Sequence, residues 1–206
     1  MLFLLTAPRQ TGKTRWLERL IGDFDAAGVS CRGVVAPGVW EEKPDGSFEK
    51  LGIDNLLLPG KRRLRFALRR DLAKAAGAFR PSSQSAAANL GWEISDDAMW
   101  EVNAHFAKMR SAGADGRLGK GGLLIVDELG PLELLRGGGL AEAVAAVADG
   151  ALSGSEHALV VVRPELVDLA EERFARAWGG AKRIAPDEEG RLAVMRALRA
   201  LGASGR

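Results

Sequence analysis

The sequence has little cysteine and histidine and no long apolar run. Its single cysteine, Cys31, excludes an internal disulfide and a multi-cysteine zinc site, and cytoplasmic residence is the resulting expectation. His105 and His157 are far apart and lack metal-ligand spacing. No segment approaches the roughly 20 apolar residues of a membrane helix, so no membrane partner is expected. The apolar start of the chain is too short for a signal peptide and lacks its basic region, which predicts a buried strand instead.

Charge of neither sign dominates the chain. Its 206 residues include 29 Lys and Arg against 27 Asp and Glu, a formal net charge of +2. This overall balance says nothing about nucleic acid, because a nucleic-acid binder needs a local basic surface, for which Lys61 to Arg70 is the one candidate. We expect a nucleic-acid partner to be the less favoured use of that cluster. The Asn-Lys-x-Asp motif of guanine-specific switch proteins is also missing. The composition is that of an ordinary soluble globular protein, and the length predicts one domain over 1–206.

Apolar runs alternate with amphipathic segments along the chain. This pattern is typical of an α/β fold with a mostly parallel sheet covered by helices on both faces. Strands are expected over 2–6, 32–39, 48–58, 63–69, 123–126, 158–162 and 182–184. Helices are expected over 14–27, 96–110, 140–151, 164–177 and 188–201, each with apolar residues at helical spacing.

A β-hairpin-rich insertion is predicted over about 33–70. Turn signals at Asp45-Gly46 and Pro59-Gly60 separate strand-like runs, and Pro37 favours an edge position or an early end for the second strand. Residues 71–91 are rich in Ala, Ser and Gly with little periodicity, which predicts mostly loop. Residues 111–122 contain several glycines and predict a surface loop.

The first motif with chemical meaning follows the first strand. The segment Ala7-Pro-Arg-Gln-Thr-Gly-Lys-Thr14 fits the Walker A pattern, with alanine at the usual first glycine. Such a loop directs backbone N–H groups at a phosphate chain, while its lysine reaches the β- and γ-phosphates and its threonine hydroxyl ligates Mg²⁺. The expected nucleotide-binding residues are Ala7, Pro8, Arg9, Gln10, Thr11, Gly12, Lys13, Thr14 and Arg15.

The second motif is an apolar strand that ends in two carboxylates. Leu123-Leu-Ile-Val126 is followed by Asp127 and Glu128, as in a Walker B strand. Asp127 is expected to hold Mg²⁺ near Thr14, directly or through water. Glu128 is then the candidate for activating or orienting the attacking water. The alternative is a solvated acidic turn, which the presence of Walker A in the same chain makes the weaker interpretation.

The residues from Asp127 to Leu134 resemble the DE-I-G-x-M-E-L signature of small bacterial and archaeal nucleoside-triphosphatases of the cancer-related nucleoside-triphosphatase type. The resemblance extends to the Walker A loop, to Gly33–Pro37 and to Gly52–Asp54, and covers most of residues 1–135. The later half agrees only in its alternation of strands and helices. Departures from the family pattern are Ala7, Leu132 in place of methionine, and Arg163-Pro164 where members often have a histidine.

This resemblance implies a RecA-like P-loop fold, a three-layer sandwich, and slow magnesium-dependent hydrolysis of ATP, GTP and other nucleoside triphosphates. Residue by residue, it gives Lys13 and Thr14 the phosphate and metal roles, Asp127 the metal role and Glu128 the catalytic role. Glu133 matches a signature position to which we assign no chemistry. Mg²⁺ is the expected cofactor, and a nucleoside triphosphate such as ATP or GTP is the expected ligand.

Several residues leave alternatives open. The basic cluster from Lys61 to Arg70 fits a charged, solvated edge strand, a phosphate-binding lid or, less well, a nucleic-acid contact. Arg163 fits a charge-stabilising arginine or a simple ion pair. Trp40, Trp92 and Trp100 could stack on a base, although packing is the default. Two other functions use the same loop: a small-molecule or nucleotide kinase with residues 61–70 as lid, and a nucleotide-dependent switch that acts on an unidentified protein partner.

Overall fold

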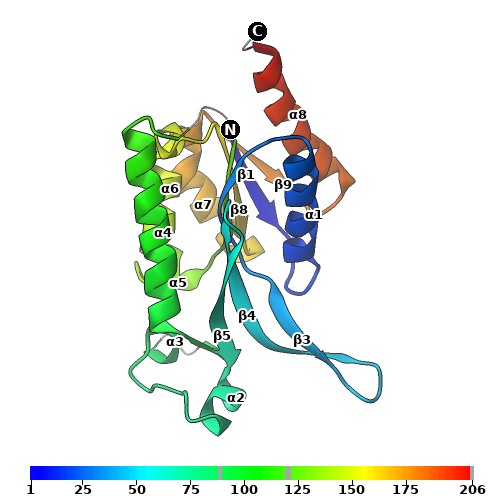
Figure 1. The fold of residues 1–206 in the computed structure, drawn as a ribbon, viewed down its shortest axis with the longest axis vertical. Helices are drawn as coiled ribbons and strands as arrows, with labels where there is room; N and C mark the ends of the chain where they lie inside the picture. Colours follow the sequence, from blue (N-terminus) through cyan, green and yellow to red (C-terminus); the bar gives the residue numbers. More distant parts are fainter. Residues whose placement is uncertain (88–89, 119–121, 205–206) are drawn as a thin grey trace.

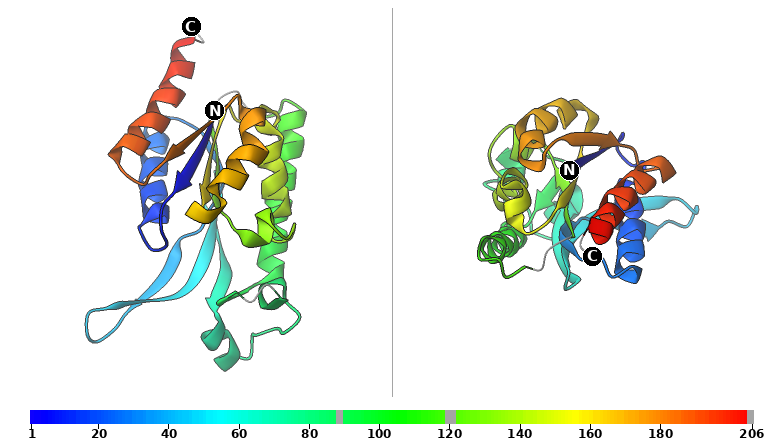
Figure 2. Two further views of the ribbon diagram at one scale, coloured as in Figure 1. Left: turned by 180° about the vertical axis from the view of Figure 1, so that it is seen from behind. Right: turned by 90° about the horizontal axis from the view of Figure 1, so that it is seen from above.

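The computed structural model of the protein describes residues 1–87, 90–118 and 122–204. Within these ranges, nine strands form one sheet in the order β6-β5-β4-β2-β7-β8-β1-β9, with β3 pairing to β4 outside this path. Helices lie on both faces of the sheet, α1 and α8 on one side and α4, α6 and α7 on the other (Figures 1 and 2). The fold is therefore the expected α/β sandwich around a mostly parallel sheet.

Five neighbouring strands make the parallel part of the sheet. All pairs among them are parallel, and their order is β2 (Cys31–Val35), β7 (Leu123–Leu129), β8 (His157–Val162), β1 (Leu2–Thr6) and β9 (Ala181–Ile184). The four inner strands are almost entirely buried, since helices cover both faces. This explains the apolar runs in β1, β7 and β8, whereas β2 also buries Arg32. Because the strands are parallel, their carboxyl ends meet at one edge of the sheet, and the loops after them gather there.

The helices form two apolar layers against the sheet. The layer under α1 (Lys13–Ala26) and α8 (Glu188–Ser204) includes Phe3, Ile125 and the expected buried filler Cys31. The opposite layer is covered by α4 (Asp96–Ala114), α6 (Ala141–Ala148) and α7 (Val167–Phe174). No helix within the described ranges combines the length and the apolar character needed to cross a membrane.

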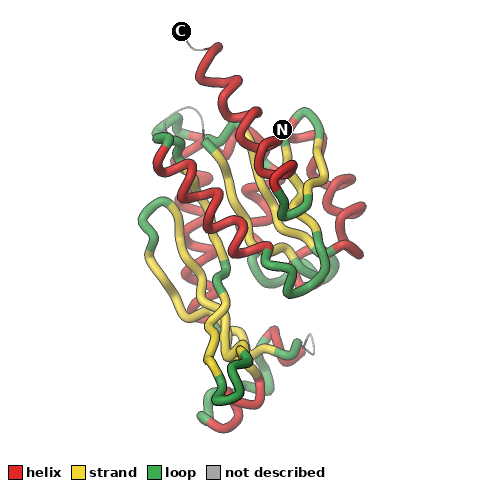
Figure 3. The backbone as a smooth tube through the Cα atoms, turned by 90° about the vertical axis from the view of Figure 1, so that its right-hand side faces the viewer, coloured by secondary structure: helices red, strands yellow, loops and turns green. Residues whose placement is uncertain are grey.

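The antiparallel insertion extends the sheet beyond β2. Its strands are β3 (Gly38–Glu42), β4 (Phe48–Leu58), β5 (Arg62–Arg69) and β6 (Trp92–Ile94). The expected strand 32–39 is in fact two strands, because the chain leaves β2 after Val35 and β3 begins only after Pro37, which has no N–H for a ladder. Figure 3 shows that the insertion makes up one end of the molecule, beyond the main helical layers.

Two predicted loops are partly helical. Residues 71–91 contain most of α2 (Arg70–Ala75) and all of α3 (Gln84–Ala87), while 88–89 lie outside the described residues. The loop predicted from residue 111 starts later, because α4 continues to Ala114, and 119–121 are also not described. Two further predicted helices contain short 3₁₀ turns at 150–153, 164–166 and 175–178. A short additional helix, α5 (Pro131–Leu134), follows β7.

We expect Phe106→Ala to lower the free energy of unfolding by about 3–5 kcal/mol, because it leaves a cavity in the core. Phe106 is fully buried in the apolar layer between α4 and the sheet. Trp100→Ala on the same helix is the matched control, since Trp100 is 71% exposed and its loss should change stability by less than about 0.5 kcal/mol. Urea denaturation measures both variants, and equal midpoints would contradict the packing described here.

Candidate functional site

The loop from Ala7 to Gly12 joins the carboxyl end of β1 to the first turn of α1. Gly12 has φ 85, a left-handed conformation that suits glycine, and its carbonyl accepts the first helical bond from the Trp16 N–H at 2.9 Å. The Lys13 side chain folds back, and its Nζ donates to the carbonyls of Ala7 at 2.7 Å and Pro8 at 2.8 Å. The lysine ammonium and the N–H groups of the helix start therefore lie at the same loop, an arrangement suited to an anion.

The other predicted loop residues are at the surface. Pro8, Arg9, Gln10 and Thr11 are exposed, and the Thr11 hydroxyl donates to the Pro8 carbonyl at 2.8 Å, which closes the loop on itself. Arg15 is exposed on the first turn of α1. The structure thus presents the loop to solvent and keeps Lys13 buried, so a ligand reaches the loop from outside.

Asp127, near the end of β7, is the point at which the two motifs meet. The Thr14 hydroxyl donates to Asp127 Oδ2 at 2.9 Å, across 113 positions of sequence. The Ala36 N–H donates to the same oxygen at 3.1 Å. Burial raises the pKa of the Asp127 carboxyl to about 7, while the hydrogen bonds from Ala36 and Thr14 act in the opposite direction. The expected neighbours Thr14 and Asp127 are therefore in direct contact.

Glu128, the next residue, faces a cation from the adjacent strand. Arg163 follows β8, and its Nε and Nη2 each lie 3.1 Å from Glu128 Oε1. Both side chains are partly exposed, at 21% for Arg163 and 35% for Glu128. The peptide bond between Asp127 and Glu128 is cis. Of the two interpretations of Arg163, the structure shows the ion pair, and its partner is Glu128, the carboxylate for which a catalytic role is predicted.

Glu133, the third carboxylate of the signature, holds two backbone segments together. Its two oxygens accept hydrogen bonds from the Gly130 N–H at 2.9 Å and from the Leu140 N–H at 3.2 Å. Burial raises the pKa of the Glu133 carboxyl, and these two N–H donors act against that shift. Glu133 therefore fixes the start of α5 and the segment that returns to α6, in agreement with the absence of an assigned chemical role.

The donor atoms at the motif junction suit a hard divalent cation. Thr14 supplies a hydroxyl oxygen and Asp127 a carboxylate oxygen, which are ligands that Mg²⁺ prefers. Among the described residues, no group of three or more His, Cys, Asp and Glu side chains could hold a metal ion by itself. Mg²⁺ typically binds one or two protein ligands together with phosphate oxygens and water, so the residues present fit this ion as the partner of a phosphate ligand.

The basic cluster from Lys61 to Arg70 is largely neutralised by carboxylates. Asp54 pairs with Arg63 and Arg65, and the remaining pairs are Lys61–Asp25, Arg62–Glu101, Arg69–Glu49 and Arg69–Asp71. Lys61 contacts the last turns of α1, and Asp25 lies about 18 Å along the helix from Lys13 at 1.5 Å per residue. Lys61 is thus remote from the loop Ala7–Gly12. The strand itself is an edge only in part, since its end pairs with β6.

One cation near the carboxylates was not anticipated from the sequence. The Nζ atom of Lys50 lies 5.2 Å from the centroid of the Trp92 ring and 5.9 Å from that of Trp40. Burial lowers the pKa of Lys50, and the charges of Asp127 and Glu128 oppose this shift. Both tryptophans are candidates from the sequence, but nothing in the sequence distinguishes Lys50 from other lysines. Only the pairing of the strands brings Lys50 close to the two rings.

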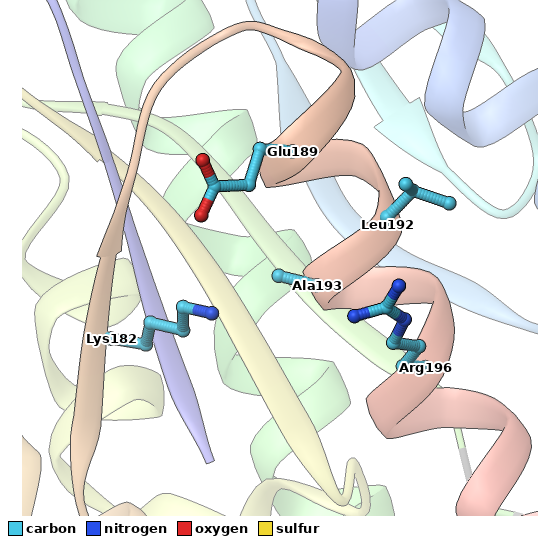
Figure 4. Close-up of a pocket in the computed structure, with 5 residues that line it drawn as sticks. All are labelled: Lys182, Glu189, Leu192, Ala193 and Arg196. Atoms are coloured by element: carbon cyan, nitrogen blue, oxygen red, sulfur yellow. The ribbon is translucent and has the colours of Figure 1, made fainter.

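A separate shallow pocket lies between β9 and α8. Figure 4 shows its five lining side chains, Lys182, Glu189, Leu192, Ala193 and Arg196. Lys182 is the register partner of Phe3, near the start of β1, whereas the loop Ala7–Gly12 follows the end of that strand. The pocket therefore does not belong to the site formed by the two motifs.

Comparison with known proteins gives one informative likeness. The sequence matches no protein-family model and no curated protein. The fold is similar to the solution structure of a human cancer-related nucleoside triphosphatase, with a TM-score of 0.57 and 18% sequence identity. The match covers 100% of this chain and 98% of that protein, so it extends over the insertion as well as the parallel sheet. At this identity the likeness establishes the fold.

Proposed function

We propose that this protein is a magnesium-dependent nucleoside triphosphatase that slowly converts a nucleoside triphosphate to the diphosphate and phosphate. The observation that carries the proposal is the contact of 2.9 Å between the Thr14 hydroxyl and the Asp127 carboxylate. It joins the loop that we assign to phosphate with the carboxylate that we assign to Mg²⁺, at the edge of a parallel sheet where such folds bind ligands. The likeness in fold to a protein described as a nucleoside triphosphatase supports the same conclusion.

Binding uses the loop from Ala7 to Thr14. Its backbone N–H groups and the start of α1 surround the phosphate chain, and the Lys13 ammonium exchanges its two carbonyl partners for phosphate oxygens. Thr14 and Asp127 are the residues that would hold Mg²⁺. The ion, when bound, neutralises part of the charge on the β- and γ-phosphates. Because this loop contacts phosphates and no base, we expect little preference among nucleobases.

Glu128 activates the water molecule that attacks the γ-phosphate. In hydrolysis, the water oxygen bonds to the γ-phosphorus, the bond from phosphorus to the β–γ bridging oxygen breaks, and its electron pair remains on the diphosphate. Glu128 orients the water and accepts its proton, which then passes to the phosphate product. Arg163 contacts Glu128 through two nitrogens and is a positioning residue for it. Lys13 stabilises the charge that develops on the phosphate oxygens.

Phosphate release from ATP, GTP, CTP and UTP tests this function directly. We expect turnover of all four in the presence of Mg²⁺ and a loss of at least about 100-fold when EDTA removes the metal, because the phosphate charge is then unscreened. Re-addition of Mg²⁺ serves as the control and should restore the rate. Nucleotide binding without turnover would contradict hydrolysis and redirect the search to an acceptor molecule for a kinase, or to a protein partner for a switch.

A further inference from the structure

The β3–β4 hairpin begins at the candidate site. Ala36, whose N–H holds Asp127 Oδ2 at 3.1 Å, lies two residues before Gly38, the first residue of β3. From there the hairpin extends beyond the carboxyl ends of the parallel strands (Figure 1). Two residues span at most about 7 Å, so the base of the hairpin stays close to the carboxylate. A side chain at this base can therefore reach a ligand held by the phosphate loop.

The side chain of Lys50 reaches back to that base from the middle of the hairpin. It is the register partner of Trp40 in the β3–β4 ladder, and directly paired residues project on the same face of a sheet. A Cβ atom added to Gly38 would lie 2.9 Å from Lys50 Cε and 2.5 Å from Trp40 Nε1, so the lysine stem packs on the bare backbone of Gly38. The absence of a side chain at Gly38 thus creates the space that the lysine occupies.

The Lys50 ammonium is held by aromatic rings. Its distances to the ring centroids of Trp92 and Trp40 are 5.2 Å and 5.9 Å, within the range of cation–π contacts. Within the part of the chain that the structure describes, no carboxylate forms an ion pair with it. Lys61, just before the neighbouring strand β5, and the arginines of β5 from Arg62 to Arg69 instead have carboxylate partners. The charge of Lys50 is therefore available to an anion.

The geometry points to the Lys50 ammonium, at the hairpin base, as a second phosphate-binding cation that contacts the γ-phosphate of a bound nucleoside triphosphate. This inference rests on the proposed function and adds to it a contact from the insertion. A charge-assisted hydrogen bond to phosphate is stronger than a cation–π contact at a partly exposed site. The Lys50 ammonium therefore leaves the tryptophan rings and binds the phosphate when the ligand is present. The electrostatic influence of Asp127 and Glu128 on Lys50 agrees with this location.

A γ-phosphate contact makes a distinctive prediction about ligand preference. A diphosphate lacks the group that Lys50 contacts, whereas Lys13 also reaches the β-phosphate that both ligands share. Loss of the Lys50 charge should therefore weaken triphosphate binding and leave diphosphate binding nearly unchanged. If Lys50 only maintained the shape of the hairpin, its replacement would weaken triphosphate binding and diphosphate binding equally.

We expect Lys50→Met, which keeps the stem and removes the charge, to weaken binding of the β,γ-imido analogue of ATP by about 10- to 100-fold. ADP binding should change by less than about twofold. Isothermal titration calorimetry with Mg²⁺ present measures both affinities, and phosphate release should fall by a similar factor. Lys50→Arg keeps a cation and should retain most of the triphosphate preference, so it tests the proposal even if the methionine variant folds poorly.

Lys61→Met is the matched control, since Lys61 is an exposed lysine of the same insertion and pairs with Asp25, far from the loop. Its affinities should equal those of the unchanged protein. Equal triphosphate affinity in Lys50→Met and the unchanged protein would overturn the Lys50 contact alone, provided that Lys13→Ala weakens binding. Equal losses for ADP and the analogue would overturn it as well. An unchanged protein that binds no nucleotide would overturn both proposals.

Discussion

Replacement of Lys13 by alanine is expected to reduce nucleoside-triphosphate hydrolysis by at least about 1,000-fold and to weaken nucleotide binding. Lys13 is buried beneath the loop, and its ammonium contacts the backbone carbonyls of Ala7 and Pro8, so no other cation can take its place there without rearranging the loop. Without it, the charge that develops on the transferring phosphoryl group has no lysine to stabilise it. Phosphate release and calorimetric binding of the imido analogue measure the two effects.

The control for this variant is Arg19→Ala, which removes an exposed cation from the same helix, outside the loop. We expect hydrolysis at the rate of the unchanged protein. Thermal unfolding of Lys13→Ala separates loss of chemistry from loss of fold, because the two carbonyls that lose their donor lie at a solvent-accessible loop and can bind water instead. Undiminished turnover by a folded Lys13→Ala protein would refute the assignment of this loop to phosphate.

Replacement of Glu128 by glutamine is expected to lower turnover by about 100- to 10,000-fold while nucleotide binding is retained. Glutamine has nearly the same shape and can still accept a hydrogen bond from Arg163, but it cannot accept the proton of the attacking water. Since the bound triphosphate persists in such a variant, single-turnover phosphate release and calorimetry together distinguish slow chemistry from poor binding.

Glu165→Gln provides a matched comparison. Glu165 is an exposed carboxylate two residues after Arg163 and lies outside both motifs. We expect this variant to hydrolyse nucleotide at the rate of the unchanged protein. A wild-type rate for Glu128→Gln would show that the water is oriented by another group, and the role of Arg163 would then need to be measured separately. A rate lowered equally in both variants would indicate a general effect of negative charge at this edge of the sheet.

The parallel core and the contact between the motifs could be predicted because short segments encode them. Leu2–Leu5 and Leu123–Val126 are apolar without interruption, as strands covered on both faces require. Each precedes a motif whose chemistry depends on that placement. Once both strands belong to one parallel sheet, Thr14 and Asp127 have to lie at the same edge. The distance of 2.9 Å between them agrees with this reasoning.

The contacts of Lys50 and Arg163 could not be predicted, because they depend on strand order and register. Arg163 meets Glu128 since β8 happens to lie beside β7, and Lys50 meets Trp92 only through the intervening strand β5. The short strand β6 and helix α3 were missed for a related reason. The buried Glu93 carboxylate accepts hydrogen bonds from the Ser85 hydroxyl and the Arg80 N–H, which link β6 to α3 and the segment before it. Such tertiary contacts produce no periodic pattern in the sequence.

The outer strands of the sheet have a consequence for association between molecules. An open strand edge can pair with another chain, and the hazard grows with the length and the apolar character of that edge. Here the path through the sheet ends in β6, with three residues, and β9, with four. Strand β3 also has an open edge and carries exposed Glu41 and Glu42. The part of β5 that precedes its pairing with β6 carries exposed Arg62, Arg63 and Arg65. Within the described ranges, these open edges are thus short or charged, which disfavours edge-to-edge aggregation of the sheet.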